Sequence, residues 1–300
     1  MLRATYAKRA DIARRSSQHL SSLPVNKSRF NGRGGKQASK LDNKKIVKNP
    51  DAVRIIPIGG LAEGGIGNNM TAIEYKDELI IIDMGSIFPS GNDYPGIALM
   101  TPDSEYLRKN KHNLKAVLFT HAHLDHVGAC RYLLPEFPAP VYGTPFTIEM
   151  IKRQMKESTS QYEPQYIPVN AHAHERIQVS KYISVEFVHV LHSIPGCTAL
   201  IIRTPNGVIM HSGDWRFEKE PINEPFDMAR LEEVSRTEGI ALMLNESTNI
   251  DVPGTHPHSE QTVAKNIGAA LDRYENSRVI VSCFSSQLHR IQLILDEVAK

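Results

Sequence analysis

A short run of histidines with one carboxylate is the part of this 300-residue chain best equipped for chemistry. His121, His123, Asp125 and His126 come directly after the apolar run Ala116–Phe119, which predicts a buried strand. On an extended segment leaving a strand, residues two apart point the same way, so His121 and His123 can converge on one ion. Asp125 and His126, displaced along the turn, would face a second ion. An ordinary polar loop is the alternative, but this order of residues is far more restrictive than a lone histidine, and we interpret it as a metal site.

Three more candidate ligands stand at the ends of other predicted strands. His192 follows the valine-rich stretch Ser184–Leu191, and a Pro-Gly pair soon after it stops the strand. Asp214 follows the second arm of a hairpin that an Asn-Gly pair predicts. Asp83 ends the apolar run Leu79–Ile82. Each of these residues alone is more typical of a turn, but together they strengthen the metal hypothesis.

On these residues the chain resembles the metallo-β-lactamase superfamily, in which two β-sheets face each other between helices and the metals lie along one edge. The resemblance implies an α/β fold, an αββα sandwich, with two Zn²⁺ ions in the complete active site. It also implies the role of each residue: one zinc held by His121, His123 and His192, a second held by Asp125 and His126, Asp214 bridging the two, and Asp83 orienting a histidine through its other ring nitrogen.

Later blocks resemble the ribonuclease J family, within the β-CASP group of nucleic-acid-processing enzymes. Glu246 occupies the place of an acidic residue that follows the bridging aspartate in that family. The resemblance extends over about residues 53–300, and implies RNA hydrolysis by 5′-to-3′ exonuclease or endonuclease action in RNA decay and maturation, with Glu246 and Asp214 catalytic. The blocks that carry it are 56–60, 69–71, 244–249, 252–254, 259–260, 278–284 and 285–292, the last two at the strand and helix expected to enter the β-CASP domain.

The resemblance is incomplete at its C-terminal end. The family has a late metal-binding histidine and a Ser-Gly-His loop for the RNA phosphate, both downstream of the inserted domain. Here the chain stops at Lys300, within an apolar pattern at Leu288, Ile291, Leu295 and Val298 that predicts a helix without a stop signal. We therefore expect a C-terminally truncated piece of a longer protein, whose full-length parent forms a homo-oligomer.

The expected mechanism follows from the two metals. Zinc lowers the pKa of a bridging water toward about 7, and the resulting hydroxide would attack an RNA phosphodiester in line. Glu246 would protonate the leaving oxygen, although a helix-capping or turn-stabilising glutamate is the alternative. Another hydrolase of this fold, such as a glyoxalase II-like thioesterase, is a competing function that the block around Glu246 disfavours. A non-catalytic RNA-binding partner is a second, which the six retained ligands disfavour.

Positive charge is concentrated at the N-terminus. Residues 1–50 contain 13 Lys or Arg against Asp11 and Asp42, so 13 − 2 gives +11, whereas the remainder has 22 against 31, which gives −9. The tail is rich in Gly, Ser and Asn and cannot bury enough apolar surface to order itself. It is either simply solvated or attracts RNA non-specifically through its phosphates. Its Arg- and Ser-rich beginning also leaves organellar targeting open.

No apolar run approaches the roughly 18 residues needed to span a bilayer, and no secretory signal is present. Cys130, Cys197 and Cys283 are odd in number and widely spaced, as in a reducing compartment. We expect a soluble cytoplasmic protein that binds RNA and no membrane. The segment Gly59–Gly67 lacks the Lys and Ser or Thr of a phosphate-binding loop, so we interpret it as a turn that needs positive φ.

The expected organisation is a basic disordered tail (1–52), a metallo-β-lactamase domain (53–235) and the incomplete beginning of a β-CASP α/β domain (236–300). The Pro-rich interval 163–169 is expected to be a loop. Helices are expected over 100–109, 126–134, 145–156 and 260–274.

Overall fold

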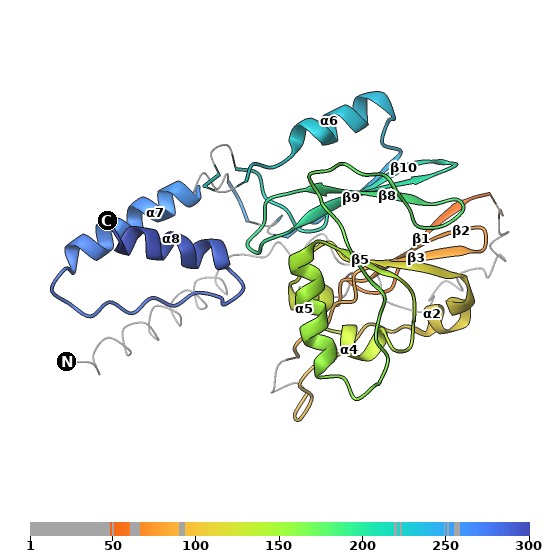
Figure 1. Cartoon of the computed structure of the whole chain (residues 1–300), viewed down its shortest axis with the longest axis horizontal. Helices are drawn as coiled ribbons and strands as arrows, with labels where there is room; N and C mark the ends of the chain where they lie inside the picture. Colours follow the sequence, from red (N-terminus) through yellow and green to blue (C-terminus); the bar gives the residue numbers. More distant parts are fainter. Residues whose placement is uncertain are drawn as a thin grey trace, which may run out of the picture. The chain divides into compact units, whose positions relative to one another are not determined.

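The computed structural model describes residues 49, 51–60, 67–89, 94–218, 221–222, 224–248, 250, 252–254 and 259–300. The expected tail lies almost entirely outside these residues. From Asn49 onward the chain forms one compact unit, and it has the expected mixed α/β fold (Figure 1). Within the described part, no helix is long and apolar enough to cross a membrane.

Two β-sheets make up the framework. The first has the order β1-β2-β3-β4-β5-β6, antiparallel up to β3 and parallel from β3 onward. The second has the order β11-β10-β9-β8-β7 and is antiparallel except for the parallel pair β10 and β11. The first sheet comprises β1 (Val53–Pro57), β2 (Thr71–Tyr75), β3 (Glu78–Ile82), β4 (Leu114–Leu118), β5 (Val141–Gly143) and β6 (Tyr166–Pro168). The second comprises β7 (Ile177–Gln178), β8 (Ser184–His189), β9 (Thr198–Thr204), β10 (Gly207–His211) and β11 (Leu242–Leu244).

Helices cover the outer faces of the two sheets. Figure 1 shows α4 and α5 beside the first sheet and α6 beside the second. Helices α7 and α8, toward the C-terminal end, pack against each other. The helical segments are α2 (Glu105–Asn110), η2 (Lys111–Asn113), α3 (Leu124–Val127), α4 (Cys130–Leu133), α5 (Pro145–Lys156), α6 (Met228–Thr237), α7 (Glu260–Arg273) and α8 (Leu288–Val298).

Apolar side chains point alternately to the two faces of each sheet, and this alternation forms the packed layers of the sandwich. In β3, Ile80 and Ile82 face the second sheet, whereas Leu79 and Ile81 belong to the cluster under α4 and α5. A third cluster joins the outer face of the second sheet to α6 through residues such as Val234. Full burial of an isoleucine side chain stabilises a fold by roughly 1.5–3 kcal/mol, so these three clusters hold the αββα sandwich together.

The predicted helix over 126–134 is wrong as a single helix. It is divided between α3 and α4 because two backbone groups at the join bond elsewhere. The N–H of Ala129, which a continuous helix would bond to the carbonyl of Asp125, donates instead to Met84 O at 3.0 Å. The carbonyl of Asp125 accepts from Asn69 N, also at 3.0 Å. The loop of candidate ligands is thus bonded to its neighbours rather than to a helix.

Other elements differ from expectation for identifiable reasons. The Pro-rich interval 163–169 contains β6, which pairs with β5 at the edge of the first sheet, where Pro168 is tolerated. The expected strand at 278–284 is absent: no described strand pairs with it, and Ile280 is 86% exposed. The second sheet extends through β11 to Leu244, and the domain boundaries expected from the sequence stay a prediction.

Candidate metal centre

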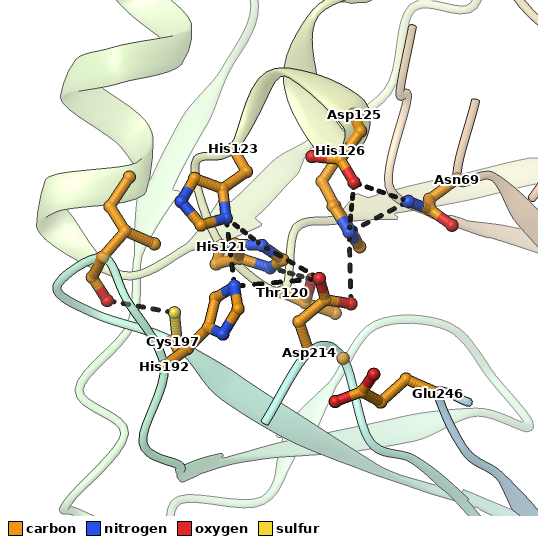
Figure 2. A network of polar contacts seen from close by, with 12 residues as sticks. Asn69, Thr120, His121, His123, Asp125, His126, His192, Cys197, Asp214 and Glu246 are labelled. Atoms are coloured by element: carbon orange, nitrogen blue, oxygen red, sulfur yellow. Dashed lines mark hydrogen bonds and ion pairs between the residues drawn. The ribbon is translucent and has the colours of Figure 1, made fainter. Parts of the chain in front are cut away.

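The candidate ligands and Asp83 come from four strand ends along one edge of the sandwich. Asp83 follows β3, His121 and His123 follow β4, His192 follows β8, and Asp214 follows β10. The carboxyl ends of the parallel strands β3 and β4 meet at the same edge. The second sheet brings its own strand ends against them, so residues far apart in the sequence converge there (Figure 2).

Three imidazoles form the first donor group. His123 Nδ1 lies 3.1 Å from both His121 Nε2 and His192 Nε2. The ligand atoms of the three residues all lie within 4.8 Å of one another. Nitrogens around a tetrahedral zinc, at about 2.0–2.1 Å from the ion, are roughly 3.3 Å apart, so this spacing suits a shared metal.

Asp214 faces this group and a second one. Its Oδ2 is 3.9 Å from His121 Nε2 and 3.7 Å from His192 Nε2, while its Oδ1 is 3.3 Å from His126 Nε2. Asp125 Oδ2 is 3.5 Å from that same His126 nitrogen. The carboxylate of Asp214 therefore lies between the two groups, and the residues present form a metal-binding arrangement.

Burial and local charge control protonation here. Burial lowers the pKa of His192 to about 4 and the pKa of His121 well below its usual value, which leaves the lone pair of each imidazole free for a metal. For His126, burial is again the largest influence and lowers the pKa, but Asp83 and Asp214 together raise it well above its usual value. Burial tends to raise the pKa of Asp214, yet the histidines, His126 first, lower it overall.

Asp83 connects two of the strand ends. Its Oδ2 lies 2.8 Å from His126 Nδ1 and accepts a hydrogen bond from the Thr120 hydroxyl at 2.8 Å, while its Oδ1 accepts from the Thr120 N–H at 2.8 Å. Asp83 is buried and has a φ of 60°, a left-handed conformation that Asp tolerates better than most residues. These bonds fix the ring orientation of His126 and point its Nε2 at Asp214.

The backbone of the ligand loop is held by the segment after β3. Met84 N donates to His126 O at 2.7 Å, and Ser86 N donates to Leu124 O at 3.1 Å. Gly85 lies between these two bonds, and a Cβ there would stand 1.7 Å from the carbonyl oxygen of Asp125. The close approach that holds the loop is possible only with glycine at this position.

Asn69 is a site residue that the sequence alone does not reveal. Its Nδ2 lies 3.1 Å from Asp125 Oδ2 and 3.0 Å from His126 Nε2, so it contacts both candidate ligands of the second group. No metal-ligand pattern includes an asparagine so far from the histidines. Its place in the Asn-Met-Thr block that resembles the ribonuclease J family was the only signal.

Glu246 lies beside Asp214 because β11 runs parallel to β10. Its Oε1 accepts from Trp215 N at 3.3 Å and its Oε2 accepts from Thr248 N at 3.2 Å, while its own N–H donates to Ser212 Oγ at 3.1 Å. The half-buried carboxylate thus stabilises a turn at the site edge. Asn249, in the same block that resembles the ribonuclease J family, lies outside the described residues.

The model of the metallo-β-lactamase superfamily matches residues 64–282, which is most of the chain. The chain belongs to this superfamily. A protein of unknown function from Enterococcus faecalis has a similar fold, with a TM-score of 0.58, 21% identity, and coverage of 81% of this chain and 63% of that one. The superfamily membership accounts for the sandwich and for the position of the donor groups at its edge.

Curated relatives of this superfamily member include proteins named ribonuclease J. That of Thermus thermophilus is 34% identical over 253 residues, covering 82% of this chain and 43% of the relative. That of Helicobacter pylori strain 26695 is 37% identical over 241 residues, covering 80% and 34% respectively. The chain therefore spans less than half the length of these relatives.

Proposed function

We propose that this chain carries the active site of a zinc-dependent ribonuclease that hydrolyses RNA phosphodiester bonds. The observation that carries the proposal is the position of Asp214 between two donor groups, in a chain similar to proteins named ribonuclease J. A carboxylate between two metals is typical of hydrolases that act on phosphate esters. The ribonuclease names of the relatives direct the proposal toward RNA.

Zinc suits the donor set that the chain offers. His121, His123 and His192 would hold one ion through neutral imidazoles. Imidazole nitrogens are typical ligands of zinc, whereas magnesium is bound by oxygen ligands. A second ion would be held by Asp125 and His126, with Asp214 bridging. Bound zinc supplies Lewis-acid polarisation of a phosphoryl oxygen and acidifies water.

Two further carboxylates would orient a metal ligand and transfer a proton. Asp83 contacts the Nδ1 of His126, so that the Nε2 of His126 is the nitrogen that faces Asp214. Glu246, held by the N–H of Trp215 next to Asp214, would give a proton to the leaving oxygen of the cleaved bond. Its turn-stabilising contacts would then serve to aim the carboxyl group as well.

The proposal also covers the cellular role, oligomeric state and compartment of the protein. We infer action on RNA in decay and maturation by 5′-to-3′ exonuclease or endonuclease cleavage, in a homo-oligomeric cytoplasmic protein. Cys130, Cys197 and Cys283 are free thiols, which suits a reducing compartment. Light scattering of the whole gene product would give its oligomeric state.

The test is Asp214→Ala in the whole gene product, assayed on a 5′-monophosphorylated RNA oligonucleotide. Loss of the carboxylate between the two groups should lower cleavage by more than the roughly 10–100-fold typical of residues that only orient ligands. Asp103→Ala removes an exposed carboxylate outside the centre and is the control. Near-normal cleavage by Asp214→Ala, or thioester hydrolysis by a wild-type protein that leaves RNA intact, would overturn the proposal.

A further inference from the structure

A second cluster of metal-binding side chains lies outside the centre described above. It comprises His172 in the turn between β6 and β7, His189 at the end of β8, and Glu224 between β10 and α6. Their candidate ligand atoms all lie within 4.8 Å of one another, and His172 Nε2 is 3.1 Å from Glu224 Oε2. None of the three takes part in the proposed reaction.

His189 has a buried nitrogen whose bonding capacity is unused. The residue is only 8% exposed, and within the described part of the chain its Nε2 has no hydrogen-bond partner. A buried polar atom without a partner costs free energy, and most such atoms in folded proteins are paired. The ring of His189 lies against that of His172, with ring centroids 4.9 Å apart, so a second imidazole stands beside the unpaired one.

We propose that His172, His189 and Glu224 form an auxiliary binding site for a divalent transition-metal cation, best matched by Zn²⁺. Two imidazoles and one carboxylate are a recognised three-ligand set for zinc, and the set has too few oxygens for calcium or magnesium. A cation there satisfies the buried nitrogen of His189 and balances the charge of Glu224. It also links three segments that are distant in sequence.

Two residues of the proposed site border a pocket of about 380 Å³. The lining of the pocket includes His189 and Glu224, and also His192 of the metal centre. The ligand atoms of His192 group with those of His121 and His123, whereas those of His189 group with His172 and Glu224, so the two sites are separate donor groups. The auxiliary site would therefore add a positive charge beside the centre. The inference does not rest on the proposed ribonuclease activity, because it concerns cation binding alone.

The test counts zinc ions bound by the metal-free chain. Wild type and variants are titrated with Zn²⁺ by calorimetry, and the metal retained after desalting is measured by mass spectrometry. His172→Ala and Glu224→Gln alter exposed residues and leave the core intact. At zinc concentrations that saturate wild type, each should bind one zinc fewer per chain, and Mg²⁺ should not replace that zinc.

Two further variants separate this site from its surroundings. His174→Asn changes a histidine of the same turn whose Nε2 is 2.5 Å from Asp227, and asparagine tolerates its φ of 52°; its zinc count should equal that of wild type. Adding Asp214→Ala to His172→Ala should give additive losses if the two sites are independent. Wild-type zinc stoichiometry and affinity in both His172→Ala and Glu224→Gln would overturn the inference, as would equal occupation by Mg²⁺. A failure of RNA cleavage would leave the zinc count unaffected.

Discussion

Glu246 accepts hydrogen bonds from two backbone N–H groups at once, that of Trp215 in the segment after β10 and that of Thr248 in its own turn. For a proton donor, such contacts would aim the carboxyl group; for a purely structural residue, they would be its whole purpose. The substitution Glu246→Gln separates these roles because it keeps the size of the side chain and one acceptor oxygen. We expect a loss of RNA cleavage of roughly 10²-fold or more, with zinc content and RNA affinity retained.

The control for this prediction is Glu238→Gln. Glu238 is a carboxylate bound by Arg203 and belongs to no donor group of the metal centre, so its variant should cleave RNA as wild type does. A Glu246→Gln enzyme with an unchanged rate would leave Glu246 with its structural role alone. Comparing kcat with KM shows whether the chemical step or substrate binding is affected.

We propose that Asp83 orients His126 for metal binding, and Asp83→Asn tests that role. Asparagine accepts the left-handed φ of 60° and can still bind the Thr120 N–H, but it removes the negative charge at His126 Nδ1. We expect zinc affinity to fall by roughly 10–100-fold, as measured by competition with a chelator. Asp103→Asn, at an exposed carboxylate that accepts from Glu105 N, is the matched control. Unchanged zinc affinity in Asp83→Asn would mean that the ligand loop alone orients His126.

At the scale of elements, the ligand loop depends on the tight crossing at Gly85. In Gly85→Ala, the added Cβ would collide with backbone atoms of Asp125, which cannot move without disturbing the loop. We expect a loss of stability of about 1–3 kcal/mol in urea unfolding, together with weaker zinc binding. Gly143→Ala is the control, since its nearest contact would be an ordinary 3.4 Å from Thr147 Cγ2. Equal stability of the two variants would show that the backbone around Gly85 and Asp125 shifts at little cost.

Elements with strong local signals could be predicted from the sequence. The bounds of α5 agree with expectation because Pro145 suits a first helical turn and an apolar stripe follows it. The division between α3 and α4 could not be predicted, since it depends on Asn69 before β2 and Met84 after β3, which bond to the loop only in the folded chain. Helix α6 was missed because it buries only Leu231 and Val234, too few for a clear period.

In the candidate site, too, residues within a local sequence pattern could be predicted, whereas residues that join the site only on folding could not. The histidine run identified its own residues, and the strand-end positions suggested that His192 and Asp214 would join them. Asn69 could not be identified, because its contacts with Asp125 and His126 exist only in the folded chain. The proposed auxiliary site could not be identified either, as His172, His189 and Glu224 share no motif.

At the scale of the whole molecule, the excess positive charge lies in the N-terminal residues and the candidate ligands lie elsewhere in the chain. Deleting residues 1–50 removes a net charge of +11 and none of the candidate ligands. Because cationic residues release counterions from RNA, we expect weaker RNA binding and a flatter dependence of affinity on salt. Turnover at saturating RNA should be unchanged. A Gly/Ser tail of equal length is the control and should behave like the deletion; loss of turnover at saturating RNA would contradict the prediction.

The hydrogen bonds that hold the ligand loop bear on how the proposed centre would take up metal ions. Met84, Ser86 and Asn69 hold the loop through backbone bonds that require no ion. A zinc finger folds only as it takes up its metal, so for that class chelation means unfolding. Here the ligand loop is already held in position by these bonds, so it would lose little conformational entropy when a metal binds. Metals should therefore exchange in and out of a domain that stays folded throughout.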